Sequence, residues 1–138
     1  MKRRIVFGIL AVLWLGFIFF NSLQDAETSG GISQGVLEML GLPYAIENFV
    51  RKLAHFTFFM VLGILVSGAL SAKKFPGVAI LLCVLLCACA DETLQLFSLG
   101  RSSELRDVWI DFAGGAMGVV VTALYGFWKK KQKITIEK

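Results

Sequence analysis

The feature that most constrains this sequence is a set of four apolar runs, each about as long as a membrane-spanning helix. The runs cover residues 5–23, 49–70, 75–96 and 108–128. A helix needs about 20 apolar residues to cross the hydrocarbon core of a bilayer. The chain has 138 residues, 57% of them hydrophobic, and a mean hydropathy of +0.73, which is too apolar for a small soluble domain. The sequence therefore predicts an all-α integral membrane bundle of four transmembrane helices.

The stretch between the first and second runs has mixed polarity and predicts one further helix. Apolar residues recur at helical spacing within 30–42, which indicates a short amphipathic helix lying on the outer interface or capping the bundle. Ser29 or Ser33 is the expected N-cap, and Gly41 and Pro43 are the expected stop signals. No linker or repeat divides the chain, so we expect residues 1–138 to form a single domain.

In a four-helix threading, in which the chain crosses the membrane four times, the basic residues are distributed unevenly between the two sides. Ten of the fourteen Lys and Arg residues, with one acid, lie in the two termini and in the turn between the second and third runs. The other side carries four basic residues and nine acids. The positive-inside rule then predicts that both termini are cytoplasmic. The first run is followed by no small-x-small cleavage pattern, so we expect it to remain as a helix. The basic tails indicate topology, and no nucleic-acid partner is expected.

Ionisable residues stand at the outer ends of the second, third and fourth runs, so the threading brings them to one depth. In chain order they are Arg51, Lys52, His55, Asp91, Glu92, Arg101, Arg106, Asp107 and Asp111. Charged side chains within a membrane are costly, so such a cluster is a candidate functional site. A step of four residues places Asp91 and Gln95 on one helix face. Steps of three or four residues likewise place Asp107, Asp111, Gly114 and Gly118 on one face of the fourth run, and the small size of the glycines lets another helix approach closely.

Three motifs follow one another along the second to fourth runs. They are Arg51-Lys52-Leu53-Ala54-His55-Phe56, Asp91-Glu92-Thr93-Leu94-Gln95, and Arg101 followed by Asp107-Val108 and Gly114-Gly115-x-x-Gly118. Together they resemble the VanZ-like family, over most of the chain from about residue 20 to residue 124. One departure is Asp111, where many relatives have Asn. The namesake of this family is associated with low-level resistance to the glycopeptide teicoplanin. The resemblance implies a multi-pass protein of the bacterial cytoplasmic membrane with a role in the cell envelope, and by itself it does not imply an enzyme.

The first functional hypothesis is a membrane enzyme or modifier that acts on a lipid-linked envelope molecule at the outer leaflet. Arginines suit phosphate because the guanidinium fork donates two parallel hydrogen bonds. A carboxyl group held near a like charge is suited to general acid–base chemistry, and a histidine titrates near neutral pH. The catalytic candidates are Asp91, Glu92 and His55, and the substrate-binding candidates are Arg51, Lys52, Gln95, Arg101, Arg106, Asp107 and Asp111.

Other functions use the same residues. A non-catalytic protein that shields an envelope lipid or a lipophilic antibiotic needs the arginines alone. A small lipid transporter ranks last, because little besides Ser67 marks the bilayer midplane, where transporter sites usually lie. A purely structural role, with arginines pairing the acids, is the remaining alternative.

The adjacent arginines also argue against a metal site, so we expect no metal and no cofactor. The expected partner is a membrane lipid or lipid-linked envelope precursor, and the glycine-bearing faces permit a homo-oligomer. Whether any reaction is catalysed stays open.

Overall fold

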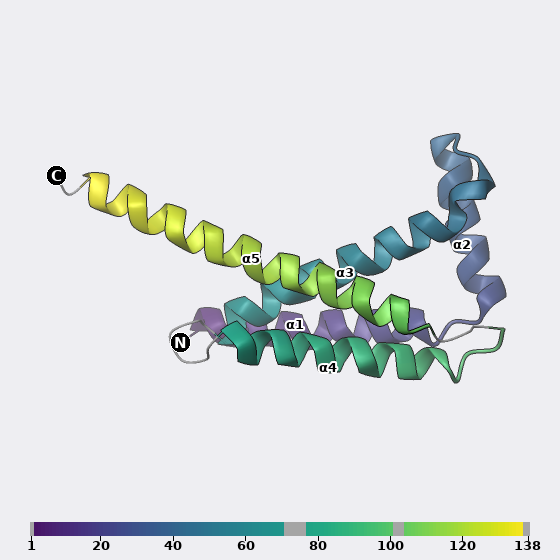
Figure 1. Ribbon diagram of the computed structural model, residues 1–138, viewed down its shortest axis with the longest axis horizontal. Coiled ribbons are helices and arrows are strands. Elements are labelled where there is room, and N and C mark those ends of the chain that lie inside the picture. The colour runs from purple at the N-terminus through teal and green to yellow at the C-terminus, as the bar shows by residue number, and fades with distance from the viewer. Residues whose placement is uncertain (1, 71–76, 101–103, 137–138) are drawn as a thin grey trace.

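The computed structural model describes residues 2–70, 77–100 and 104–136, and this part of the chain is helical almost throughout, with no strand (Figure 1). The helices are α1 (Lys2–Ser22), α2 (Ala26–Leu40), α3 (Glu47–Leu70), α4 (Gly77–Gln95) and α5 (Leu105–Ile136), and a short 3₁₀ helix, η1 (Tyr44–Ile46), precedes α3. The predicted all-α class is therefore confirmed. The predicted turn between the second and third spans lies outside the described residues.

Four helical stretches are long and apolar enough to cross a membrane, as the sequence predicts. They are Lys2–Ser22, Tyr44–Leu70, Gly77–Gln95 and Leu105–Lys133. The fourth departs most from its predicted bounds of 108–128, because α5 continues to Ile136. Lysine and glutamine favour helix, so the basic segment after the apolar run extends α5 instead of ending it. At about 1.5 Å per residue α5 measures ~48 Å, and its C-terminal part projects beyond the other helices (Figure 1).

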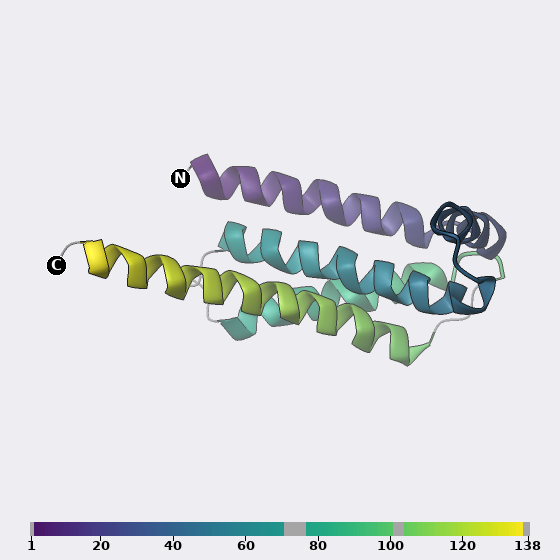
Figure 2. The same ribbon diagram turned by 90° about the horizontal axis from the view of Figure 1, so that it is seen from above.

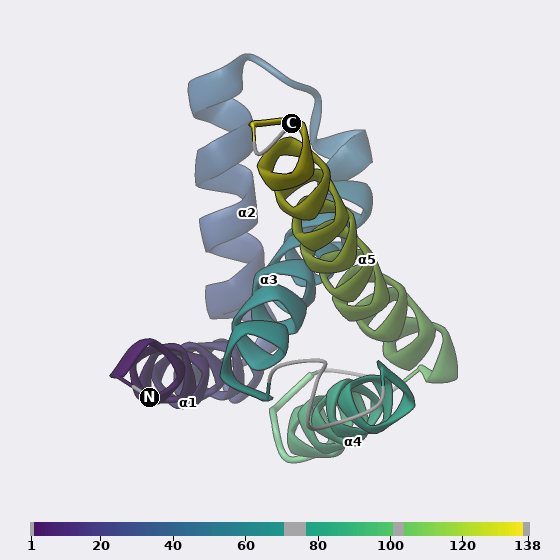
Figure 3. The ribbon, with the colours of Figure 1, turned by 90° about the vertical axis from the view of Figure 1, so that its left-hand side faces the viewer.

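Helix α3 is central to the bundle and packs against every other α-helix. It lies between α1 and α5, and its contact with α5 is the most extensive in the molecule (Figure 2). The indole Nε1 of Trp14 on α1 donates a hydrogen bond of 2.9 Å to the carbonyl oxygen of Phe58 on α3. Both termini lie at one end of the bundle, and α2 runs across the opposite end, transverse to the spans (Figures 1 and 3).

Glycines set the distance between α3 and α5. A Cβ at Gly114 would overlap the carbonyl oxygen of Phe56, and a Cβ at Gly118 would overlap that of Met60. Gly115 on α5 likewise lies against Gly63 on α3. The two backbones therefore meet more closely than any side chain would allow, as the spacing of small residues predicts.

The bundle keeps a small apolar core and presents apolar side chains outward. The buried core cluster consists of Ile18, Phe59, Leu62, Val66, Ile80, Val84 and Ala88. Large hydrophobic side chains are exposed along every span, for example Val12, Leu86 and Phe127, each at least 70% exposed. A water-soluble domain rarely exposes so continuous an apolar surface, so this exterior suits a lipid environment.

Helix α2 is longer than predicted and has a different N-cap. The Asp25 side chain accepts a hydrogen bond of 2.7 Å from the Thr28 amide, and hydrogen bonds from Thr28 lower the pKa of Asp25. The predicted caps, Ser29 and Ser33, lie inside the helix, because Asp25 satisfies the first free amides earlier in the chain. Gly41 ends the helix in the left-handed conformation, as predicted. Most of the apolar side chains of α2 are exposed.

Replacing Gly118 by Ala should push α3 and α5 apart. We expect a loss of about 1–3 kcal/mol in the free energy of unfolding, because the new methyl group meets the backbone at Met60. The matched control is Gly126→Ala on the same helix, where no neighbouring atom lies within 4 Å. This control should be neutral or slightly stabilising. Denaturation of the purified protein in detergent, followed by circular dichroism, measures both, and equal effects would contradict the packing argument.

Candidate functional site

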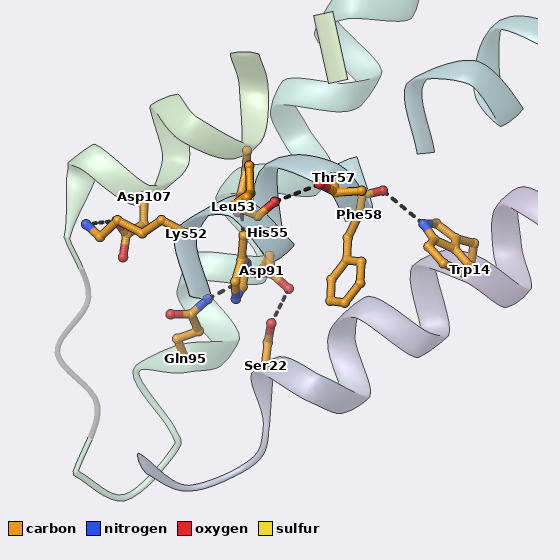
Figure 4. Close-up of polar contacts among 11 residues, drawn as sticks. Trp14, Ser22, Lys52, Leu53, His55, Thr57, Phe58, Asp91, Gln95 and Asp107 are labelled. Atoms are coloured by element: carbon orange, nitrogen blue, oxygen red, sulfur yellow. Dashed lines mark hydrogen bonds and ion pairs between the residues drawn. The ribbon is translucent and has the colours of Figure 1, made fainter. Parts of the chain in front are cut away.

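Polar side chains from four helices meet at the end of the bundle opposite the termini (Figure 4). Helix α1 contributes its last residue, α3 and α5 contribute their first turns, and α4 contributes its last turns. The contributed residues are Ser22, Arg51, Lys52, His55, Asp91, Gln95, Asp107 and Asp111. The structure thus brings most of the predicted site residues to one depth.

Asp91 is the centre of this cluster and is completely buried. Its Oδ1 accepts a hydrogen bond of 2.6 Å from the hydroxyl of Ser22, and its Oδ2 accepts one of 3.1 Å from Nε2 of Gln95. The Nδ1 of His55 lies 3.7 Å from the same Oδ2. One carboxylate therefore joins α1, α3 and α4. Gln95 takes the place that the four-residue spacing predicts.

Asp111 approaches the same histidine from α5. It is also completely buried, and its Oδ1 lies 3.5 Å from Nδ1 of His55. Neither of its carboxylate oxygens has a hydrogen-bond partner among the described residues. Donor atoms of His55, Asp91 and Asp111 all lie within 4.8 Å of one another. A single imidazole nitrogen thus faces two buried carboxylates.

Glu92 does not join this group, although it follows Asp91 directly. Its Oε1 accepts a hydrogen bond of 2.6 Å from the backbone amide of Glu104, just before α5 begins, and the residue is only 5% exposed. Successive residues on a helix point about 100° apart, so two neighbouring acids reach different partners. In the described part of the chain, Asp91 is grouped with the carboxylate of Asp111.

The outer rim of the site is held by a lysine. The Nζ of Lys52 lies 2.7 Å from Asp107 and 3.8 Å from Glu104, in a partly exposed position. Among the described residues Arg51 and Arg106 form no ion pair with an acid, and Arg101 lies outside them. In the described part of this rim, the acids are therefore paired with Lys52 and not with arginines, the alternative considered from the sequence.

Two cavities meet at Arg51 and His55. The first has a volume of about 100 Å³ and a mainly polar lining that includes Lys52, Gln95 and Asp111. The second has a volume of about 240 Å³ and lies between the end of α1, helix α2 and the first half of α3. Apolar side chains of α2 and α3 form much of its wall. They are Ile32, Val36, Val50 and Phe58. Arg51 and His55 line both cavities, so a polar space adjoins an amphipathic one.

Ser22 is the site residue that was not predicted. It ends an apolar run, and an uncharged serine there carries no signal of burial beside an acid. A second contact supports its position, because the hydroxyl of Ser98 donates a hydrogen bond of 2.8 Å to the Ser22 carbonyl.

Removing the Ser22 hydroxyl should weaken the junction of α1 with α4. We expect Ser22→Ala to lower the free energy of unfolding by about 1–3 kcal/mol, because a buried carboxylate loses a hydrogen-bond donor. Ser33→Ala is the control, since its hydroxyl bonds only a backbone carbonyl within α2. Chemical denaturation in detergent distinguishes the two variants. An unchanged stability for Ser22→Ala would show that the buried hydrogen bond contributes nothing.

The family model described as VanZ/LLP1 matches residues 7–126, which is most of the sequence and includes all the residues of the cluster. Neither curated proteins nor solved structures give a match. The resemblance seen in the motifs is confirmed, and the chain belongs to the VanZ/LLP1 family.

Proposed function

We propose that this VanZ-like envelope membrane protein binds the phosphate head group of a lipid-linked envelope molecule at the outer leaflet of the bacterial cytoplasmic membrane. The observation that carries the proposal is the position of Arg51. It lines both cavities and forms no ion pair with an acid among the described residues. A guanidinium group held at the boundary of a polar and an apolar space suits a phosphate attached to a hydrocarbon chain.

The shape of the second cavity supports the lipid part of the proposal. Its apolar wall is formed by α2 and α3, and its polar groups come from the end of α1, from α2 and, as Arg51 and His55, from α3. A hydrocarbon chain would lie against the apolar wall while its phosphate reaches Arg51. The exposed apolar side chains of α2, which crosses this end of the bundle, suit a helix that lies at the membrane interface (Figure 3).

The outward orientation rests on charge. The basic residues of the two termini lie at the end of the bundle opposite the site, which favours cytoplasmic termini. A lipid-linked precursor held at the outer leaflet would be shielded from a glycopeptide. Such shielding would give low-level teicoplanin resistance, the effect associated with the family's namesake.

A catalytic version of this function uses the same site. His55 and Asp91 would then move protons, and Arg51 would hold the phosphate. The observation that favours it is the contact of the His55 imidazole with two buried carboxylates, beside the polar cavity. Binding alone needs no chemical step, and measurement of the precursor pool in cells separates the two versions.

Binding should depend on Arg51. We expect Arg51→Gln to weaken the binding of a fluorescent polyprenyl phosphate by about 10-fold to 100-fold, because a charge-assisted hydrogen bond is lost. The protein is assayed in nanodiscs, and Arg51→Lys should restore part of the affinity. The control is Arg106→Gln, which makes the same change of charge at an exposed position that lines neither cavity. Equal losses in Arg51→Gln and Arg106→Gln would indicate nonspecific attraction and would overturn the proposal.

The orientation is tested by thiol labelling of intact cells. In a background with Cys83, Cys87 and Cys89 replaced by Ala, a cysteine is placed at Leu99 or at Gln132, both exposed. A membrane-impermeant maleimide should label the Leu99→Cys protein and should label Gln132→Cys only after the cells are lysed. The reverse pattern would place the site in the cytoplasm.

A further inference from the structure

The distances among His55, Asp91 and Asp111 are close to those of ligands around one metal ion. Ligand atoms about 2.0–2.2 Å from a common ion lie no more than about 4.4 Å apart. The Nδ1 of His55 lies 3.5 Å from Oδ1 of Asp111 and 3.7 Å from Oδ2 of Asp91. The whole set of donor atoms falls within 4.8 Å. A shift of a few tenths of an ångström would bring all three donors onto one ion.

The state of Asp111 is an independent reason to look for a cation. Its side chain is completely buried, and both oxygens lack a hydrogen-bond partner among the described residues. Buried charges are normally paired, hydrogen-bonded or bound to a metal. In the described part of the chain, the one basic side chain within ion-pair distance of Asp111 is that of His55, whose Nδ1 carries at most one hydrogen and faces Asp91 as well.

The surroundings of Asp91 resemble those of a metal-binding carboxylate. Ser22 and Gln95 each donate a hydrogen bond to it. Carboxylates that bind metals are commonly oriented in this way by outer hydrogen-bond donors. These contacts hold Asp91 toward His55 and Asp111, and they come from two different helices.

We propose that His55, Asp91 and Asp111 bind a divalent cation. One imidazole nitrogen with carboxylate oxygens suits a hard or borderline ion such as Mn²⁺, Mg²⁺ or Zn²⁺. The expectation that no metal binds depended on arginines neutralising the acids. Among the described residues, neither Arg51 nor Arg106 forms an ion pair with them.

The cation would lie beside the polar cavity, because His55 and Asp111 line it together with Arg51. Its remaining coordination positions would face that cavity, where a phosphate oxygen could complete the ligand set. This bridging role rests on the proposed function, whereas binding of the ion itself does not.

The test is a titration of Mn²⁺ alone into the full-length protein, purified in detergent, treated with EDTA and free of added lipid. The free Mn²⁺ signal in electron paramagnetic resonance reports the bound fraction. We expect one saturable site per chain, and a loss of affinity of at least about 10-fold in Asp111→Asn. The control is Asp107→Asn, one turn earlier on α5, where the acid pairs with Lys52. It should bind within about twofold of the wild type.

The same samples provide a check on folding. Mn²⁺ should raise the melting temperature of the wild type and of Asp107→Asn but not that of Asp111→Asn, because an ion that binds the folded state stabilises it. If Asp111→Asn does not fold, His55→Gln takes its place with the same expectation. Absence of saturable binding, or unchanged affinity in the ligand variant, would overturn the proposal.

A parallel measurement keeps this proposal distinct from the proposed function. Binding of polyprenyl phosphate is compared with Mn²⁺ present and with EDTA present. Lipid binding that depends on Arg51 but not on Mn²⁺ would overturn the bridging role of the cation and would support the proposed function. Saturable Mn²⁺ binding without any lipid binding would leave the metal site and remove the function.

Discussion

The buried carboxylate of Asp91 is the interaction on which the rest of this end of the bundle depends. It contacts Ser22 of α1, Gln95 of its own helix and His55 of α3. Because Asp91 is completely buried, bulk water cannot replace a missing donor. The ends of three helices must therefore meet at Asp91. The loop after α4 is held in place as well, since Ser98 and Leu99 hydrogen-bond to the α1–α2 junction.

The glycine contact between α3 and α5 also fixes the relative position of two helices, on the side of α3 that faces away from α1. Because the backbones touch at Gly114 and Gly118, α5 cannot shift away from α3 without losing its closest packing. Asp111 lies one helical turn before Gly114, so this packing fixes its carboxylate near His55. Close packing in the middle of the bundle thus positions charged groups at its end. The site requires both the glycine contact and the hydrogen bonds of Asp91, because each fixes the position of different helices.

The sequence predicts the position of this site better than its contacts. Helix length, threading and the four-residue period place the acids, His55 and Gln95 at one depth, and the structure agrees. The rotation of each helix decides which neighbour a side chain meets, and rotation depends on packing across the whole bundle. Asp91 therefore meets His55 while Glu92 meets the start of α5. Of two adjacent cations, Lys52 pairs with Asp107 while Arg51 lines both cavities. The start of α2 was misplaced because an aspartate further upstream supplies the cap.

The charged groups form two layers with different physical roles. The outer layer, Lys52 with Asp107 and Glu104, is partly exposed, and such pairs contribute little to stability. The inner layer, His55 with Asp91 and Asp111, is removed from water, where charge without full compensation is costly. Packing alone does not require this cost, because apolar residues would join the same helices. The buried layer includes Asp111, whose oxygens have no hydrogen-bond partner among the described residues, and this observation beside a polar cavity supports the proposed charged ligand over a purely structural role.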